Sequence, residues 1–372
     1  MIQTYSTTIR RKEMDAVLTC MVDERIGPGE LNDRFIALVK EFFGCDGAVA
    51  LRTPEDALKY ALRCLDFQQD QKIMISALAP AWHIQAIESL GYESIVLDVD
   101  EATGLVTPEI VHQGMLEGGR LLLLHETMGI LPDVDGIVEL GIPVIEDISK
   151  SAGAALPGIE ENGKPGKARK AGSFGVFSIL GLEEKDVITA GGGAVLMAPS
   201  RREWVVLKRY VDQVAKTALL PDINCALGWI QLKEFNRNES TRKEIFELYQ
   251  RSCMSGRHKM FVRGNGASTE NGPVVESGED VQKDSPLSTS TMCAFPLILS
   301  SSFKDVKQYA SKKDIEIRLA FEDSVIALRE EELSSSCIRA KSLYLRAAVF
   351  PLYPRLSHSQ VAKIVKVLGT LP

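Results

Sequence analysis

Short apolar runs alternate with amphipathic segments along the first 150 residues of the chain. The runs occupy 48–51, 72–76, 92–99, 121–125 and 142–145. Apolar runs of this length are typical of strands buried on both faces of a parallel sheet. The segments between them carry apolar residues at helical spacing. The pattern therefore predicts an α/β fold with a mostly parallel, seven-stranded-type sheet flanked by helices.

Amphipathic helices are predicted on both sides of the first strand. One covers 10–24 and a second covers 30–43, with a Gly-Pro-Gly break between them. The helix after the strand begins at Thr53-Pro54-Glu55. A proline in the first turn with acidic residues behind it is favourable chemistry for a helix N-terminus.

A smaller α+β domain is predicted for the last third of the chain. Two apolar strands, 293–299 and 315–319, follow a long helical segment, and a helix closes the chain. We therefore divide the sequence into a large domain, 1–240, and a small C-terminal domain, 241–372.

Two polar, glycine-containing segments are predicted as loops, 157–171 and 263–290. The first carries several basic residues, so it is either a solvated face or a flap over an anionic ligand. The second is long and rich in serine, asparagine and acidic residues, which favours a long loop or hairpin.

Composition and charge place the chain among ordinary globular proteins. Its 372 residues are 45% hydrophobic and carry a net charge of −7, which argues against a general nucleic-acid or anionic-membrane binder. The cysteines are scattered without a CxxC pair, so we expect reduced thiols, a cytoplasmic location and no metal site. No apolar run approaches the ~20 residues of a membrane span, and no signal peptide is recognised.

Three types of reactive or polar group follow the apolar run at 142–145. Asp147 closes this predicted strand, and Ser178 and Lys185 lie further along, before the triple glycine 191–193. In open α/β sheets the carboxyl ends of the strands hold the ligand crevice. Pyridoxal phosphate (PLP) requires a carboxylate for its pyridine nitrogen, a lysine for a Schiff base, and hydroxyl and N–H groups for its phosphate. The same residues would also suit a helix cap, a solvated charge and a turn.

A resemblance to the DegT/DnrJ/StrS family of PLP-dependent sugar aminotransferases is carried by three motifs in order, VIEDISKSAGA, GSFGVFS and KDVITAGGGAV. It covers nearly the whole chain and is most specific at 129–154, 219–250 and 347–368. His125 falls where the family has a histidine, although it would otherwise suit a hydrogen-bonded core position. The resemblance implies the PLP-transferase fold type I.

The resemblance also implies a role for each candidate residue. Asp147 would bind the pyridine nitrogen and Ser178 the phosphate. Lys185 would form the Schiff base and then act as general base. Trp82 is the candidate for the aromatic ring stacked on the pyridine, with His83 as the neighbouring alternative, and a tryptophan at a helix start also suits the core.

The spacing of the motifs departs from the family pattern at two points. Lys185 lies seven residues after Ser178, where the family has about five, which predicts a two-residue insertion near 181–184. Gly191 stands where the family has a glutamate in its Gly-rich turn.

The expected phosphate-binding turn departs more strongly. Pro54 and Glu55 stand where the family has Gly-Thr. Proline removes an N–H donor, and a glutamate repels a phosphate dianion. Thr53 would partly substitute as a phosphate ligand, and a plain capped helix is the other interpretation.

The resemblance implies a PLP-dependent aminotransferase, with glutamate as amino donor and a nucleotide-linked keto-sugar as acceptor. It further implies a homodimer with shared active sites, in the biosynthesis of cell-surface polysaccharides or antibiotic sugars. Two alternatives stay open. One is a diverged member that binds PLP weakly or is not catalytic, which the departures favour. The other is a PLP-dependent sugar dehydratase, although such enzymes of the family carry histidine in place of Lys185.

Overall fold

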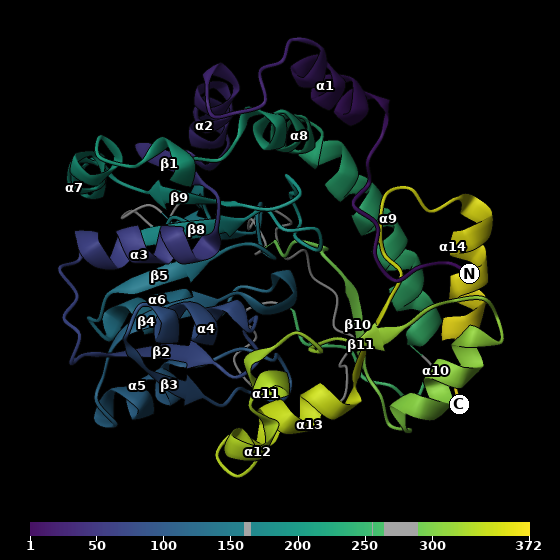
Figure 1. Cartoon of the computed structure of the whole chain (residues 1–372). Helices are drawn as coiled ribbons and strands as arrows, with labels where there is room; N and C mark the ends of the chain where they lie inside the picture. Colours follow the sequence, from purple (N-terminus) through teal and green to yellow (C-terminus); the bar gives the residue numbers. More distant parts are fainter. Residues whose placement is uncertain (160–164, 255, 264–288) are drawn as a thin grey trace.

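A seven-stranded sheet forms the larger part of the computed structural model, which describes residues 1–159, 165–254, 256–263 and 289–372 (Figure 1). The strand order is β1-β9-β8-β5-β4-β2-β3. β9 runs antiparallel to both neighbours, and the four pairs from β8 to β3 are parallel. The predicted mostly parallel α/β sheet is confirmed. The strands are β1 (Gly47–Leu51), β2 (Lys72–Ser76), β3 (Glu93–Leu97), β4 (Gly119–His125), β5 (Val144–Asp147), β8 (Phe177–Gly181) and β9 (Ala194–Ala198).

Alternating side chains of the strands build a core on each face of this sheet. In β1, Ala48 and Ala50 pack with helices α2 and α8, whereas Val49 and Leu51 pack with α3 and α7. Because both faces are covered, the strands read as continuous apolar runs in the sequence. The helices around the sheet are α2 (Glu30–Phe43), α3 (Pro54–Cys64), α4 (Trp82–Ser89), α5 (Pro108–Leu116), α6 (Val134–Glu139), α7 (Arg201–Val211) and α8 (Asp222–Lys233).

A three-stranded antiparallel sheet organises the C-terminal part, in the order β10-β12-β11. Its strands are β10 (Phe295–Ile298), β11 (Arg318–Leu319) and β12 (Ala347–Phe350). Helices α9 (Phe235–Cys253), α10 (Phe303–Ser311) and α14 (His358–Leu368) pack on it in one apolar cluster. The predicted smaller α+β part is therefore present, and α9 runs into it from α8 (Figure 1). Ile2 belongs to the same cluster and bridges to Ile315.

A two-stranded antiparallel ribbon, β6 (Ala155–Ile159) and β7 (Pro165–Lys170), replaces the loop predicted over 157–171. That prediction was wrong because backbone pairing requires no apolar pattern, and the described side chains of β7 are largely exposed. A side chain at Gly158 would meet the Lys167 carbonyl at 2.0 Å, so glycine permits the close approach of the two strands. Of the other predicted loop, 263–290, residues 264–288 lie outside the described part of the chain.

The remaining helices are α1 (Arg11–Val22), which contacts α8, and α11 (Val325–Leu328), α12 (Glu330–Leu333) and α13 (Ile338–Arg346) between β11 and β12. Within the described ranges, no helix combines the length and apolar character needed to cross a membrane. All seven cysteines are unpaired thiols, as the sequence predicted.

Candidate active site

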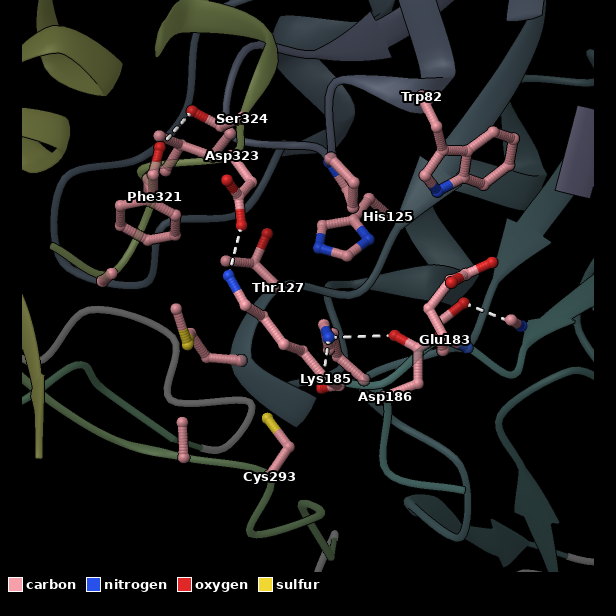
Figure 2. Close-up of a pocket in the computed structure, with 18 of the residues that line it drawn as sticks. Trp82, His125, Thr127, Glu183, Lys185, Asp186, Cys293, Phe321, Asp323 and Ser324 are labelled. Carbon is pink, nitrogen blue, oxygen red and sulfur yellow. Dashed lines mark hydrogen bonds and ion pairs between the residues drawn. The ribbon is translucent and has the colours of Figure 1, made fainter. Parts of the chain in front are cut away.

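A cavity of about 360 Å³ lies where the carboxyl end of the large sheet meets the C-terminal segment. His125 ends β4, Ser149 and Lys150 follow β5, and Gly181 ends β8. Because these strands are neighbours in the sheet, their carboxyl ends converge on one edge. The opposite wall comes from 320–324, after β11. Figure 2 shows side chains from both walls pointing into the space between them.

Asp147 ends β5, and its carboxylate is fully buried among polar groups. Oδ2 lies 2.8 Å from Nε2 of His83 and 2.9 Å from Nδ1 of His125. Oδ1 accepts hydrogen bonds from the Ser149 amide, at 3.1 Å, and from the Ser149 hydroxyl. His125 and Ser149 line the cavity, whereas Asp147 is not among its lining residues. The carboxylate is therefore covered by its own hydrogen-bond donors.

The charge states of this cluster follow from burial and hydrogen bonding. Burial raises the pKa of Asp147, but hydrogen bonds from His125 and His83 outweigh it and leave the pKa well below its usual value. Burial lowers the pKa of His83, so we assign a neutral ring that donates from Nε2. Its Nδ1 atom is buried, and within the described part of the chain it has no hydrogen-bond partner. The cluster is an ionised carboxylate held by two histidines.

Thr53 is the N-cap of α3 and lies at the start of the expected phosphate-binding turn. Its Oγ1 accepts a hydrogen bond from the amide of Asp56 at 3.0 Å and donates to the Asp56 carboxylate. Pro54 has no N–H, and Glu55 adds a second carboxylate to the first turn. The helix N-terminus therefore offers few free donors and two negative charges.

The same tripeptide begins helix α5 at Thr107-Pro108-Glu109. There Thr107 is the N-cap, accepting from the amide of Ile110, and the proline occupies the first turn. Because α5 makes the same arrangement away from the cavity, the turn at α3 has the features of an ordinary helix cap.

Ser178, the predicted phosphate ligand, faces away from the cavity. It lies in β8, is fully buried, and donates its hydroxyl to the Gly172 carbonyl at 3.1 Å. It is not among the residues that line the cavity. The structure thus separates Ser178 from Trp82 and Lys185, which do line it.

Lys185 reaches the cavity from a turn that follows β8. In this turn the Asp186 amide donates to the Glu183 carbonyl at 3.1 Å, and the Glu183 amide donates to the Asp186 carboxylate at 2.8 Å. Nζ of Lys185 lies 2.6 Å from Oδ2 of Asp323 (Figure 2). It also lies 3.4 Å from Oε1 of Glu322. The predicted Schiff-base lysine is thus an ion-paired ammonium.

A second lysine, Lys150, also lines the cavity and was missed at the sequence level. Its Nζ lies 2.9 Å from Oδ1 of Asp186 and donates to the Lys185 carbonyl at 2.6 Å. Burial lowers the pKa of Lys150, but the Asp186 carboxylate outweighs it and the net pKa is raised. Its position three residues after Asp147 was the available signal, since residues just beyond a strand end face the crevice.

Aromatic and acidic side chains complete the lining. Trp82, the predicted stacking residue, begins α4 and lines the cavity, with its ring 4.3 Å from that of His83. Tyr5 and Phe321 contribute two more aromatic rings. Five carboxylates but only two lysines line the cavity, so its formal charge is negative: Glu183, Glu184, Asp186, Glu322 and Asp323 against Lys150 and Lys185.

Comparison with known proteins agrees with the resemblance seen in the motifs. The sequence model of the DegT/DnrJ/EryC1/StrS aminotransferase family matches residues 7–369. Among solved structures, the aminotransferase TlmJ from Streptoalloteichus hindustanus is 17% identical, with a TM-score of 0.81 over 99% of this chain and 98% of that one. An aminotransferase from Psychrobacter cryohalolentis is 18% identical, with a TM-score of 0.79 over 97% of this chain and 96% of that one.

A dehydratase has the same fold. The Escherichia coli GDP-4-keto-6-deoxy-D-mannose-3-dehydratase, with bound hydrated PLP, is 15% identical, with a TM-score of 0.78 over 99% of both chains. At these identities the structural matches establish the shared fold and leave the chemistry to the residues of the cavity.

The residues around the cavity do not fit PLP in the way that the resemblance implies. Both carboxylate oxygens of Asp147 are occupied by protein donors, so a pyridinium N–H has no free acceptor there. The turn expected to bind the phosphate begins with Pro54, which has no N–H, and the exposed Glu55 accepts a hydrogen bond from the Ser89 hydroxyl at 2.6 Å. Ser178 donates its hydroxyl to the Gly172 carbonyl.

Proposed function

The chain belongs to the DegT/DnrJ/EryC1/StrS aminotransferase family, and we propose that within it the chain binds a sugar ligand in this cavity without PLP-dependent transamination. The observation that carries the proposal is that protein groups already hydrogen-bond both oxygens of the Asp147 carboxylate. His83, His125 and Ser149 saturate the carboxylate that a PLP enzyme of this family would use for the pyridine nitrogen. The family's fold is retained, and the cavity serves another ligand.

The lining of the cavity supports a sugar as that ligand. The aromatic rings of Tyr5, Trp82 and Phe321 offer flat apolar surfaces for the C–H face of a sugar ring. The carboxylates of Glu322 and Asp323 offer acceptors for hydroxyl groups. A hydroxylated, uncharged or cationic ring satisfies both sets of contacts. The nucleotide that we expect on the sugar is carried over from the family.

A PLP-dependent aminotransferase, with glutamate as donor and a nucleotide-linked keto-sugar as acceptor, is the second candidate. One observation favours it: Lys185 lines the same cavity as His125, which is hydrogen-bonded to Asp147. This candidate function requires Ser149 and His125 to release their hydrogen bonds to Asp147, so that the carboxylate can bind the pyridine nitrogen. It also requires the phosphate to bind beside Glu55. The dehydratase alternative has no support from the cavity, because Lys185 is present there.

Absorbance titration with PLP separates the two candidates. We expect the purified protein, folded by circular dichroism, to develop no Schiff-base band that depends on Lys185. A visible band that Lys185→Ala removes and glutamate bleaches would establish the aminotransferase and exclude our proposal. Calorimetric titration with nucleoside-diphosphate sugars, before and after Trp82→Ala, tests the sugar site directly. We expect binding that the substitution weakens at least tenfold.

A homodimer is part of the proposal. Met14, Leu18 and Met21 of α1 expose more than half of their surfaces, at 55%, 56% and 57%. Apolar side chains gathered in this way on one helix are typical of association surfaces. We propose that this face of α1 contributes to the contact between two copies of the chain.

A further inference from the structure

His125 has the geometry of a histidine that is ready to accept a proton from a ligand. Its Nδ1 lies 2.9 Å from Oδ2 of Asp147, so Nδ1 carries the proton of this hydrogen bond. The other ring nitrogen, Nε2, then has a free lone pair. Among the described residues no group donates to or accepts from Nε2, and the side chain lines the cavity although it is only 5% exposed. Figure 2 shows the ring among Trp82, Thr127 and Lys185.

Asp147 is fixed in turn by its other partners. His83 donates to the same oxygen at 2.8 Å, and Ser149 occupies the second oxygen. The Ser149 hydroxyl also accepts a hydrogen bond from the Gly181 amide at 2.9 Å. The carboxylate therefore cannot rotate away from His125 without leaving several buried donors unpaired. A buried carboxylate that fixes the tautomer and orientation of an imidazole is the arrangement that makes histidine an effective base.

The cavity also holds a cationic group for a developing negative charge. Lys150 is an ammonium held at 2.9 Å from Asp186, and it lines the same cavity as His125. An ammonium in a partly dehydrated site stabilises an oxyanion. A base and an electrophilic group on one cavity are the two parts needed to remove a proton next to a carbonyl.

We propose that His125 is the general acid–base of this cavity, with Asp147 as its positioning residue, and that it transfers a proton at the carbon next to the keto group of a bound sugar. The inference rests on the proposed function, because it requires the sugar in the cavity. Asp147 has thereby changed its task from pyridine partner to histidine partner.

The step is balanced without any further reactant. The C–H bond next to the ketone breaks, and its proton forms an N–H bond at Nε2 of His125. The electron pair of the broken C–H bond forms a C=C bond. The π electrons of the carbonyl group move to its oxygen, to which Lys150 donates a hydrogen bond. Return of a proton from Nε2 to the same face of the carbon restores the ketone, and the proton held on Nε2 exchanges with solvent between the two transfers. The net reaction is exchange of this hydrogen with solvent.

The tautomer of His125 gives a test that needs no ligand. In ¹⁵N-histidine-labelled protein we expect two-bond ¹H–¹⁵N spectra to show His125 protonated at Nδ1 and bare at Nε2. Asp147→Asn removes the carboxylate acceptor, so it should raise the population of the Nε2-protonated tautomer. A wild-type ring protonated on Nε2 would overturn the inference, whatever sugar binds.

Hydrogen exchange gives the second test, with a UDP-linked 4-keto-6-deoxyhexose as probe. In D₂O with EDTA, we expect the protein to speed loss of the ¹H signal next to the ketone. His125→Gln, which retains an amide donor for Asp147, should lower the rate by about 10²–10⁴-fold. His112→Gln, an exposed histidine on α5, is the matched control and should exchange as wild type.

The outcomes of these experiments distinguish the acid–base role of His125 from the proposed binding of a sugar. Calorimetry that detects no binding of the probe counts against the proposed sugar site. Binding without exchange, or equal exchange by wild type and His125→Gln, overturns the role of His125 alone. Because His83, His125 and Asp147 are also a ligand set that could hold a metal ion, loss of exchange in EDTA would overturn the metal-free mechanism.

Discussion

Nζ of Lys185 and Oδ2 of Asp323 lie 2.6 Å apart, so a lysine beside the large sheet is ion-paired with the segment that follows β11. The pair closes one side of the cavity and joins residues far apart in the sequence. Its two side chains are 35% and 71% exposed, so its contribution to stability is small.

Asp323→Asn should therefore affect the ligand more than the fold. We expect the free energy of unfolding to change by less than about 1 kcal/mol, while the affinity for the sugar probe falls at least tenfold. Asp314→Asn, which breaks the similarly exposed pair with Lys363, is the control. Urea unfolding and calorimetry measure the two effects. Equal probe affinity in both variants would contradict a role for Asp323 in binding.

The first turn of α3 predicts that substitution of Pro54 and Glu55 increases the affinity for PLP. Replacing Pro54 by Gly and Glu55 by Thr restores an N–H donor, adds a hydroxyl and removes a negative charge. We expect the affinity for PLP, followed by absorbance, to rise at least tenfold. The same double substitution at Pro108 and Glu109 serves as control, because α5 has the same cap away from the cavity. Equal affinities in the two variants would show that phosphate does not bind at this turn.

A buried pair of glutamates predicts the pH dependence of stability. Glu146 accepts hydrogen bonds from the amides of Gly172, Phe174 and Gly175. Both Glu126 carboxylate oxygens are buried and have no hydrogen-bond partner among the residues that the structure describes. Burial, and then the neighbouring Glu146 charge, raise the pKa of Glu126 well above its usual value. A raised pKa in the folded state means that the folded protein holds this proton more tightly than the unfolded chain does.

Protonated Glu126 therefore makes its full contribution to the free energy of unfolding below the ordinary glutamate pKa of about 4.3. This contribution is lost as the pH rises towards the pKa of Glu126 in the folded protein. Glu126→Gln replaces the protonated acid by a neutral amide, so we expect it to remove this loss and to exceed wild type at pH 8 by about 1–3 kcal/mol. Urea unfolding between pH 5 and 9 measures the difference. The exposed Glu139→Gln is the control, and a parallel decline of all three proteins would refute the assignment.

The exposed apolar face of α1 predicts the effect of a charge on assembly. Leu18→Lys places a charge within the face formed with Met14 and Met21 and should convert dimers to monomers in light scattering. Leu345→Lys, at a comparably exposed leucine on α13, should leave the mass unchanged. A wild-type protein that is monomeric at every concentration would contradict the proposed dimer.

Strands could be predicted from the sequence because burial on both faces leaves a clear signal. The run at 72–76 coincides with β2, since Ile73 and Ile75 pack into the apolar cluster on one face and Met74 into the cluster on the other. The ribbon at Ala155–Ile159 and Pro165–Lys170 could not be predicted in the same way, because its pairing is made by the backbone.

The site could be predicted only where residues follow a strand or belong to a motif. Asp147 was predicted from its position at a strand end and Trp82 from the resemblance; Trp82 lines the cavity and Asp147 does not. The capped-helix interpretation of Thr53 agrees with its hydrogen bonds. The partner of Lys185 was beyond reach, because Asp323 comes from a turn that leaves no periodic pattern. The hydrogen bonds of His83 and His125 to Asp147 could not be predicted either, since a motif specifies a residue and not its hydrogen-bond partners.

The neighbours β1 and β9 have a consequence for how the protein is made. β1 leaves the ribosome early, but its antiparallel partner is synthesised only after β2, β3, β4, β5 and β8. At about 5–20 residues per second, roughly seven to thirty seconds pass before β9 is available to pair with the first strand. During that interval its apolar faces and free backbone edge are open to association with other nascent chains.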